Sequence, residues 1–152
     1  MKQITSFLLF ALLALMACSH TTVHGITPIS PGAGRSSWTG KPPVVESWQP
    51  TFRWKPVADA TAHYDFVIFE GYGSEGEVLG NKVYYREGLQ QPEHTLEISL
   101  PPDRVYYWSV RVRRGEEVSE WSRFDWSNWA PLPGGSYYAE YPFFTFRTPS
   151  KE

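Results

Sequence analysis

The sequence predicts an all-β domain. Aromatic residues make up 16% of the 152 residues, and 13 prolines and 12 glycines interrupt the chain at short intervals. Apolar residues alternate with polar ones in short runs, as in half-buried strands, and no long stretch carries apolar residues at helical spacing. After removal of an N-terminal export segment, the remaining length fits one domain with a tether.

The first part of the domain is expected to contain five short strands bounded by turn-forming residues. They begin at Val44-Val45 and then cover 51–54, 64–68, 82–86 and 96–100. In the last of these, the alternation places Leu96, Ile98 and Leu100 on the core face.

The sixth strand has the most specific pattern. One face is expected to be buried and consists of Leu100, Pro102, Tyr106, Trp108, Val110 and Val112. The opposite face, expected to be wet, carries Tyr107, Ser109, Arg111 and Arg113. The spacing Leu-x-Pro-x-x-x-Tyr also predicts a tyrosine corner, in which the Tyr106 hydroxyl bonds to backbone just upstream.

From Pro42 to Pro149 the chain resembles a fibronectin type III domain. The resemblance rests on the proline-rich entry, Trp54, Tyr64-x-Phe66-x-Ile68, the Leu100/Pro102/Tyr106 corner and the closing Phe144-x-Phe146-x-Thr148-Pro149. It implies a seven-stranded antiparallel immunoglobulin-like sandwich of two sheets. The chain departs from the family at Gly115–Pro142, which is expected to form a long aromatic-rich loop before the last strand.

The run Ser119-Glu120-Trp121-Ser122 resembles half of the tryptophan-serine repeat of cytokine-receptor modules with this fold. There the tryptophans stack on arginines of the neighbouring strand. The resemblance implies that Trp121 stacks on Arg111 or Arg113, a structural contact worth about 0.5 to 2 kcal/mol.

Ten aromatic residues lie between Trp121 and Phe146, and two explanations compete for those in the loop. In one, the rings fold back over the open edge of the sandwich and stabilise a long loop. In the other, some remain exposed as a platform for a sugar ring or a partner protein, because rigid aromatics dominate interfaces and long ordered loops are often functional. The residues expected to make contact are Trp126, Trp129, Tyr137, Tyr138 and Tyr141.

Residues 1–17 are typical of a secretory signal peptide. Lys2 gives a positive start, an apolar run ends at Leu15, and the small Ala17 precedes the expected cut. Leu15-Met16-Ala17-Cys18 resembles a bacterial lipobox, which implies that the Cys18 thiol carries lipid, including palmitate-like acyl chains, and becomes the new N-terminus. An uncleaved transmembrane anchor is disfavoured because a bilayer core needs about 20 apolar residues, and an ordinary signal peptide with an incidental cysteine is the other alternative.

Residues 18–41 are expected to form the lipidated N-terminus and a flexible tether with a reach of roughly 25 Å. The domain follows at 42–149, with a short tail at 150–152. Because Ser19 follows the cysteine, resemblance to enterobacterial sorting implies the outer membrane in a Gram-negative host, with the domain facing the periplasm or the surface.

The chemistry of the sequence favours binding over catalysis. Loss of the signal peptide leaves 13 basic and 16 acidic residues, a net charge of −3 that predicts no nucleic acid partner. The four histidines share no element and the single thiol is assigned to lipid, so neither a metal site nor a cofactor is expected. We expect a non-catalytic, lipid-anchored envelope protein that binds or scaffolds a partner protein. The alternatives are a module for envelope polysaccharide or peptidoglycan and, least favoured, a glycan-active enzyme using acids such as Asp125.

Overall fold

The structure is a computed structural model that describes residues 22–32, 42–73, 78–125 and 143–151. Within these ranges all regular secondary structure is β. The strands are β1 (Thr22–His24), β2 (Pro28–Ser30), β3 (Thr51–Trp54), β4 (His63–Tyr72), β5 (Val78–Leu89), β6 (Glu93–Thr95), β7 (Val105–Arg114), β8 (Glu117–Val118), β9 (Arg123–Asp125) and β10 (Phe144–Arg147). No helix suited to crossing a membrane occurs in this part of the chain.

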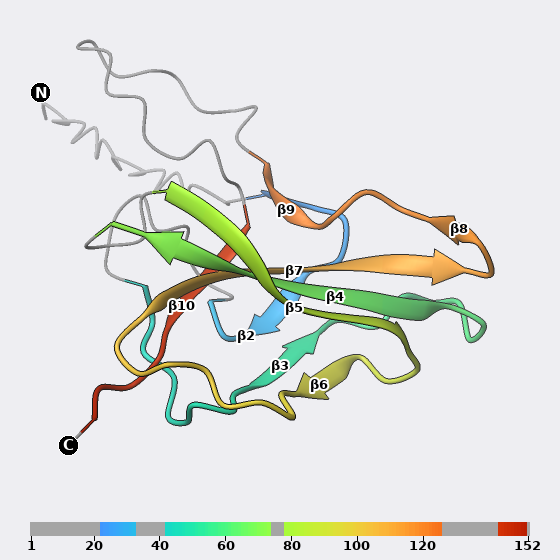
Figure 1. Ribbon diagram of the computed structural model, residues 1–152. Helices are drawn as coiled ribbons and strands as arrows, with labels where there is room; N and C mark the ends of the chain where they lie inside the picture. The colour runs from blue at the N-terminus through green and yellow to red at the C-terminus, as the bar shows by residue number, and fades with distance from the viewer. Residues whose placement is uncertain (1–21, 33–41, 74–77, 126–142, 152) are drawn as a thin grey trace, which may run out of the picture.

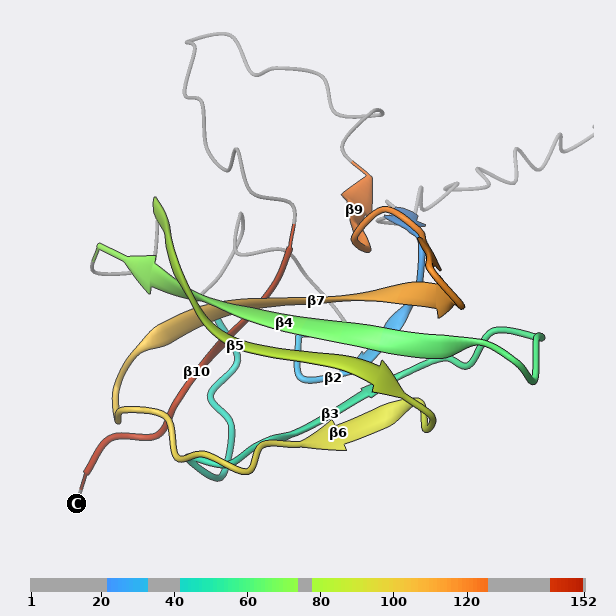
Figure 2. The same cartoon turned by 45° about the vertical axis from the view of Figure 1, so that its right-hand side comes forward.

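The strands form two packed layers. The larger sheet has the order β10-β7-β4-β5, with β8 also paired to β7, and the smaller sheet has the order β2-β3-β6. All pairings between strands are antiparallel, and β1 and β9 form a separate pair. Figures 1 and 2 both show β2, β3 and β6 on one side of the larger sheet. The prediction of an all-β antiparallel fold is confirmed, and the two layers are those of a β-sandwich.

Aromatic rings from both layers fill the space between the sheets. The Phe52 ring of β3 lies 4.7 Å from Phe66, 5.1 Å from Trp108 and 5.3 Å from Phe146, measured between centroids. All four side chains are fully buried. Such tilted and edge-on ring pairs contribute about 0.5 to 1.5 kcal/mol each beyond the area they bury, so the smaller sheet is held to the larger one mainly through β3.

Two expected strands in the first part of the domain differ from the structure. Val44 makes only an isolated parallel bridge to Arg147. The segment 96–100 is not a strand: the amides of Leu96 and Leu100 donate to carbonyls of the 48–50 segment, and the chain bends between them. Ile98 is therefore 43% exposed instead of facing the core.

The outer face of β7 is less exposed than its alternation predicted. Tyr107 and Ser109 are buried. Ser109 is covered because the chain after β8 runs back beside β7. The Ser109 hydroxyl donates to the Ser122 carbonyl at 2.6 Å, and the amide of Ser122 donates to the Val110 carbonyl at 3.0 Å. The expectation of a wet face is wrong for Tyr107 and Ser109, whereas the two arginines further along keep about a fifth to a quarter of their side chains exposed.

The segment after β7 begins with a tight hairpin rather than a loop. β8 pairs with β7 through Arg113–Val118 and Arg114–Glu117, and Gly115 turns the chain with a φ of 59°. The edge of the larger sheet beside β7 is thus occupied first by residues 117–122 and then by β10. The expectation that the whole of Gly115–Pro142 is a loop is wrong for residues 115–125, which include β8 and β9.

Residues 22–32 belong to the folded domain. β1 pairs with β9, and β2 pairs with β3 at the edge of the smaller sheet. Ile26 between them is buried in the core, and its amide donates to the Ser122 hydroxyl at 2.7 Å. Gly32 has a φ of 80° and lies so close to β10 that an added Cβ would be 2.6 Å from the Thr145 carbonyl oxygen. The expectation of a flexible tether over all of 18–41 is therefore wrong for these residues.

Candidate functional site

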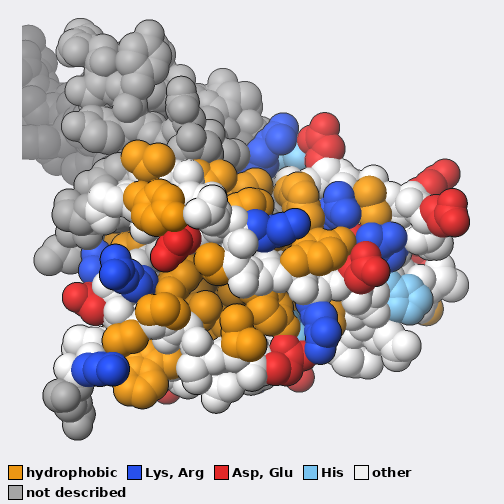
Figure 3. Space-filling model, in the orientation of Figure 1, with side chains coloured by type: hydrophobic (Ala, Val, Ile, Leu, Met, Phe, Trp, Pro, Cys, Tyr) orange, Lys and Arg blue, Asp and Glu red, His pale blue; other side chains and the backbone are white. Residues whose placement is uncertain are grey.

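The most exposed apolar surface of the larger sheet lies along β5. Its members are Tyr72 at the end of β4 and Val78, Val83 and Tyr85 on β5, which are between 37% and 53% exposed. We call these four residues the β5 surface. Figure 3 shows hydrophobic side chains gathered on the face of the molecule that carries β5. Among the described strands, β5 is the last in its sheet, so its outer edge has no neighbouring strand.

A buried charge cluster supports this surface from behind. The Asp65 carboxylate on β4 is fully buried and accepts hydrogen bonds from Arg113 at 2.7 and 2.8 Å and from Arg111 at 3.0 Å. Burial opposes its ionisation, but the hydrogen bonds from the two arginines outweigh this effect and hold the pKa of Asp65 below its usual value. Asp65 therefore remains ionised, and the cluster fixes both guanidinium groups on the outer face of the sheet.

Trp121 lies on top of one of these guanidinium groups. The Arg111 guanidinium carbon is 4.5 Å from the centroid of the Trp121 ring, and the ring of Tyr85 meets Trp121 edge-on at 6.5 Å. This is the arrangement that the tryptophan-serine pattern implied, with Arg111 as the stacked arginine. Arg113 instead joins Asp65 and, at 3.3 Å, Glu87. Of the four residues of the β5 surface, Tyr85 thus contacts this stack of side chains.

The other two residues assigned structural roles are in the core. Trp54 is 1% exposed and packs between Tyr64 and Phe66. Tyr106 is 1% exposed and stacks on Phe146, and burial raises its pKa to about 12.

Hydrogen bonds from Thr148 fix the turn that precedes Tyr106. The Thr148 hydroxyl donates to the Pro101 carbonyl at 2.7 Å and accepts from the Arg104 amide at 3.0 Å. The hydrogen bond of a tyrosine corner stays a prediction.

Six predicted site residues lie outside the part of the chain that the structure describes. They are Cys18, Trp126, Trp129, Tyr137, Tyr138 and Tyr141. The residues that flank the aromatic-rich segment are described. Asp125 ends β9, and the ring of Phe143 stacks on Phe69 of β4 at 5.8 Å. Phe143 thus lies against β4, the strand beside β5.

A polar network that the sequence analysis missed links the two sheets. The Tyr84 hydroxyl of β5 donates to Glu97 and lies 2.6 Å from His94 Nε2 in β6, while Arg86 donates to Glu97 at 2.7 Å. The Tyr84 hydroxyl, helped by Arg86, lowers the pKa of Glu97 to about 2, and burial lowers the pKa of His94. Burial and the Glu97 carboxylate raise the pKa of Tyr84. These shifts favour a neutral His94 imidazole and a neutral Tyr84 hydroxyl. The hydrogen bond between them links β5 of the larger sheet to β6 of the smaller one.

Comparisons with known proteins identify no relative of this chain. No protein-family model, curated protein or solved structure matches the chain. Within the described ranges, no group of three or more histidine, cysteine or acidic side chains is placed to hold a metal ion. The functional argument therefore depends on the β5 surface and on the predicted export signal.

Proposed function

We propose that the domain is an immunoglobulin-like sandwich of the fibronectin type III kind. Support comes from the strand order: three strands, β2-β3-β6, face four, β10-β7-β4-β5. In chain order these seven correspond to the sheets A-B-E and G-F-C-C′ of such a sandwich.

We further propose that Cys18 is lipidated and anchors the domain in the cell envelope, at the outer membrane in a Gram-negative host. The lipobox-like run supports this proposal, and the structure sharpens its consequence. β1 begins at Thr22, so only Ser19–Thr21 would separate the lipid from the folded domain. An extended chain covers at most about 3.6 Å per residue, which keeps Thr22 within roughly 14 Å of the anchored Cα. The domain would sit directly on the membrane surface.

The function that we propose for this anchored domain is non-catalytic binding of a partner protein. The observation that carries it is the β5 surface, where exposed apolar side chains lie beside the unpaired edge of a sheet. Such an edge presents rows of backbone donors and acceptors that match another polypeptide backbone. The rigid support from Asp65, Arg111 and Trp121 reduces the ordering cost of binding. Trp126 and Trp129 are proposed to extend the same contact.

Site-specific photocrosslinking in intact cells tests this proposal. A photoreactive amino acid at Val83 is expected to give a discrete protein adduct, and the same probe at Ile29, exposed at 49% on the other sheet, is expected to give none. The double variant Trp126→Ala/Trp129→Ala is expected to lose the adduct at position 83 while keeping its melting temperature. Equal adducts from both positions, or none from position 83, would refute a binding role for the β5 surface.

A further inference from the structure

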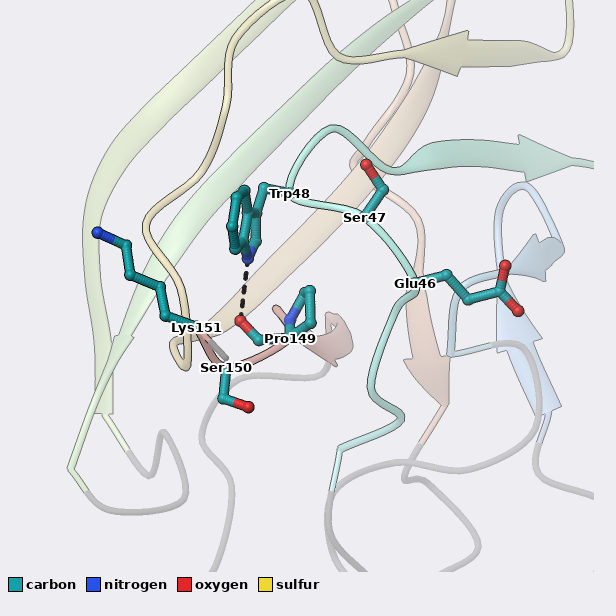
Figure 4. Close-up of a pocket in the computed structure, with 6 residues that line it drawn as sticks. All are labelled: Glu46, Ser47, Trp48, Pro149, Ser150 and Lys151. Atoms are coloured by element: carbon teal, nitrogen blue, oxygen red, sulfur yellow. Dashed lines mark hydrogen bonds between the residues drawn. The ribbon is translucent and has the colours of Figure 1, made fainter.

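A shallow groove lies between the segment that precedes β3 and the C-terminal segment that follows β10. It is lined by Glu46, Ser47, Trp48, Pro149, Ser150 and Lys151 and has a volume of about 590 Å³. That volume is within the range of small-molecule sites, about 300 to 1,000 Å³. Figure 4 shows Trp48 beside Pro149, with the side chains of Glu46 and Lys151 on opposite sides of the pair.

The indole of Trp48 is exposed but held in place. Its ring is 39% exposed, and its Nε1 donates to the Pro149 carbonyl at 3.0 Å. The Trp48 carbonyl in turn accepts the amide of Leu100 at 2.8 Å. Because the only polar atom of the indole already has a partner, the side chain offers a ligand its apolar ring surface and no donor.

Backbone hydrogen bonds fix both walls of the groove. On one side Val45 donates to Arg147 and Arg147 donates to Pro43, both at 2.9 Å. On the other side the Pro149 carbonyl also accepts the amide of Asp103 at 3.1 Å. The groove is therefore formed before any ligand arrives, which lowers the entropic cost of binding.

The groups around the indole suit a neutral ligand rich in hydroxyls. Glu46 and Lys151 contribute one charge of each sign, so the groove has no net charge that would select an ion. Carboxylate, ammonium and serine hydroxyl groups exchange hydrogen bonds with sugar hydroxyls. The C–H face of a pyranose packs on a flat indole such as that of Trp48, whose Nε1 is already bonded to Pro149.

We propose that the Trp48 groove binds a neutral saccharide, at a site separate from the β5 surface. This inference goes beyond the proposed protein-binding function and needs neither the lipid nor the partner protein. The groove lies on described residues whose backbone is tied into β10 and the 96–100 segment. Two binding surfaces on one small domain would allow it to hold a protein partner and an envelope glycan together.

An oligosaccharide array followed by calorimetry tests the proposal. The full chain, purified from membranes in detergent, is expected to bind at least one neutral oligosaccharide of the array. Trp48→Ala is expected to weaken that binding about tenfold or more. Trp48→Phe, which keeps a ring, should retain most of the affinity. Val118→Ala is the control, since Val118 on β8 is exposed to a similar extent and lies in neither proposed binding surface.

The melting temperature of each variant is measured as well, so that a loss of binding can be distinguished from a loss of folding. The proposal is overturned if no saccharide on the array binds the wild type, or if Trp48→Ala binds as tightly as Val118→Ala. Binding of an octaproline peptide that depends on Trp48, with no saccharide bound, would assign the groove to peptides and also overturn it.

Discussion

Replacing Asp65 with asparagine tests the charge cluster behind the β5 surface. Asparagine keeps the size of the side chain, but Arg111 and Arg113 would lose the carboxylate that both contact within 3.0 Å. Breaking a buried ion pair costs about 3 to 5 kcal/mol. Because the arginines remain 20% and 24% exposed, water offsets part of that cost, and we expect a loss of about 3 kcal/mol.

Calorimetry and urea unfolding measure this loss, which should lower the melting temperature by about 10 °C for a domain of this size. Glu87→Gln is the matched control, because Glu87 contacts the same Arg113 at 3.3 Å but is 65% exposed. It should change stability by less than about 0.5 kcal/mol. A cost below about 1 kcal/mol for Asp65→Asn, or equal costs for the two variants, would refute the reasoning.

The same cluster predicts a dependence of stability on acid. The pKa of Asp65 in the folded state lies below its ordinary value of 3.8, so the folded protein binds fewer protons than the unfolded chain as the pH falls. The stabilisation is complete above about pH 4 and is lost as the pH falls through the folded pKa. Asp65→Asn should flatten the decrease in unfolding free energy below pH 4. An unchanged slope would contradict this origin.

Three further substitutions test other parts of the fold. Burial lowers the pKa of His94 below its ordinary 6.5, so the unfolding free energy of the wild type should fall as the pH drops below about 6.5. Urea unfolding of His94→Gln should lack that decrease. An equal decrease in the wild type and the variant would argue against a role for His94. Trp121→Ala should lose about 0.5 to 2 kcal/mol by removing its stacked arginine contact, and a double-mutant cycle with that arginine should show coupling rather than additivity. Gly32→Ala should lower the melting temperature more than Gly88→Ala, because both have positive φ but only Gly32 meets backbone within 3 Å; equal losses would contradict the close approach to β10.

Strands with a regular alternation of apolar side chains could be predicted from the sequence. β3 and β10 follow the predicted segments, and the core faces of β4 and β7 carry the residues expected there. The contact of Trp121 with an arginine could be foreseen because a short motif carries it. In each case the pattern that predicts the feature lies within a short stretch of the sequence.

The remaining features depend on neighbours distant in the sequence. β2 has only three residues, too few to show an alternating pattern. Pro28–Ser30 forms a strand because it pairs with the edge of β3. Ser109 is buried because residues 119–122 return beside β7, which its own alternation does not reveal. The link from Tyr84 to Glu97 joins a side chain of β5 to one just after β6, 13 residues further along the chain, without a recognisable pattern. The groove at Trp48 likewise needs the C-terminal residues to complete it.

The proposed localisation in the cell envelope depends on the proposed lipidation of Cys18. The most direct measurement is the mass of the intact protein extracted from membranes, with Cys18→Ser as the control. We expect a chain that begins at Cys18 and carries a diacylglycerol thioether, and we expect the Cys18→Ser variant to be recovered without lipid. A wild-type protein with an unmodified thiol, or one that leaves the membrane in high salt, would contradict the proposed anchor.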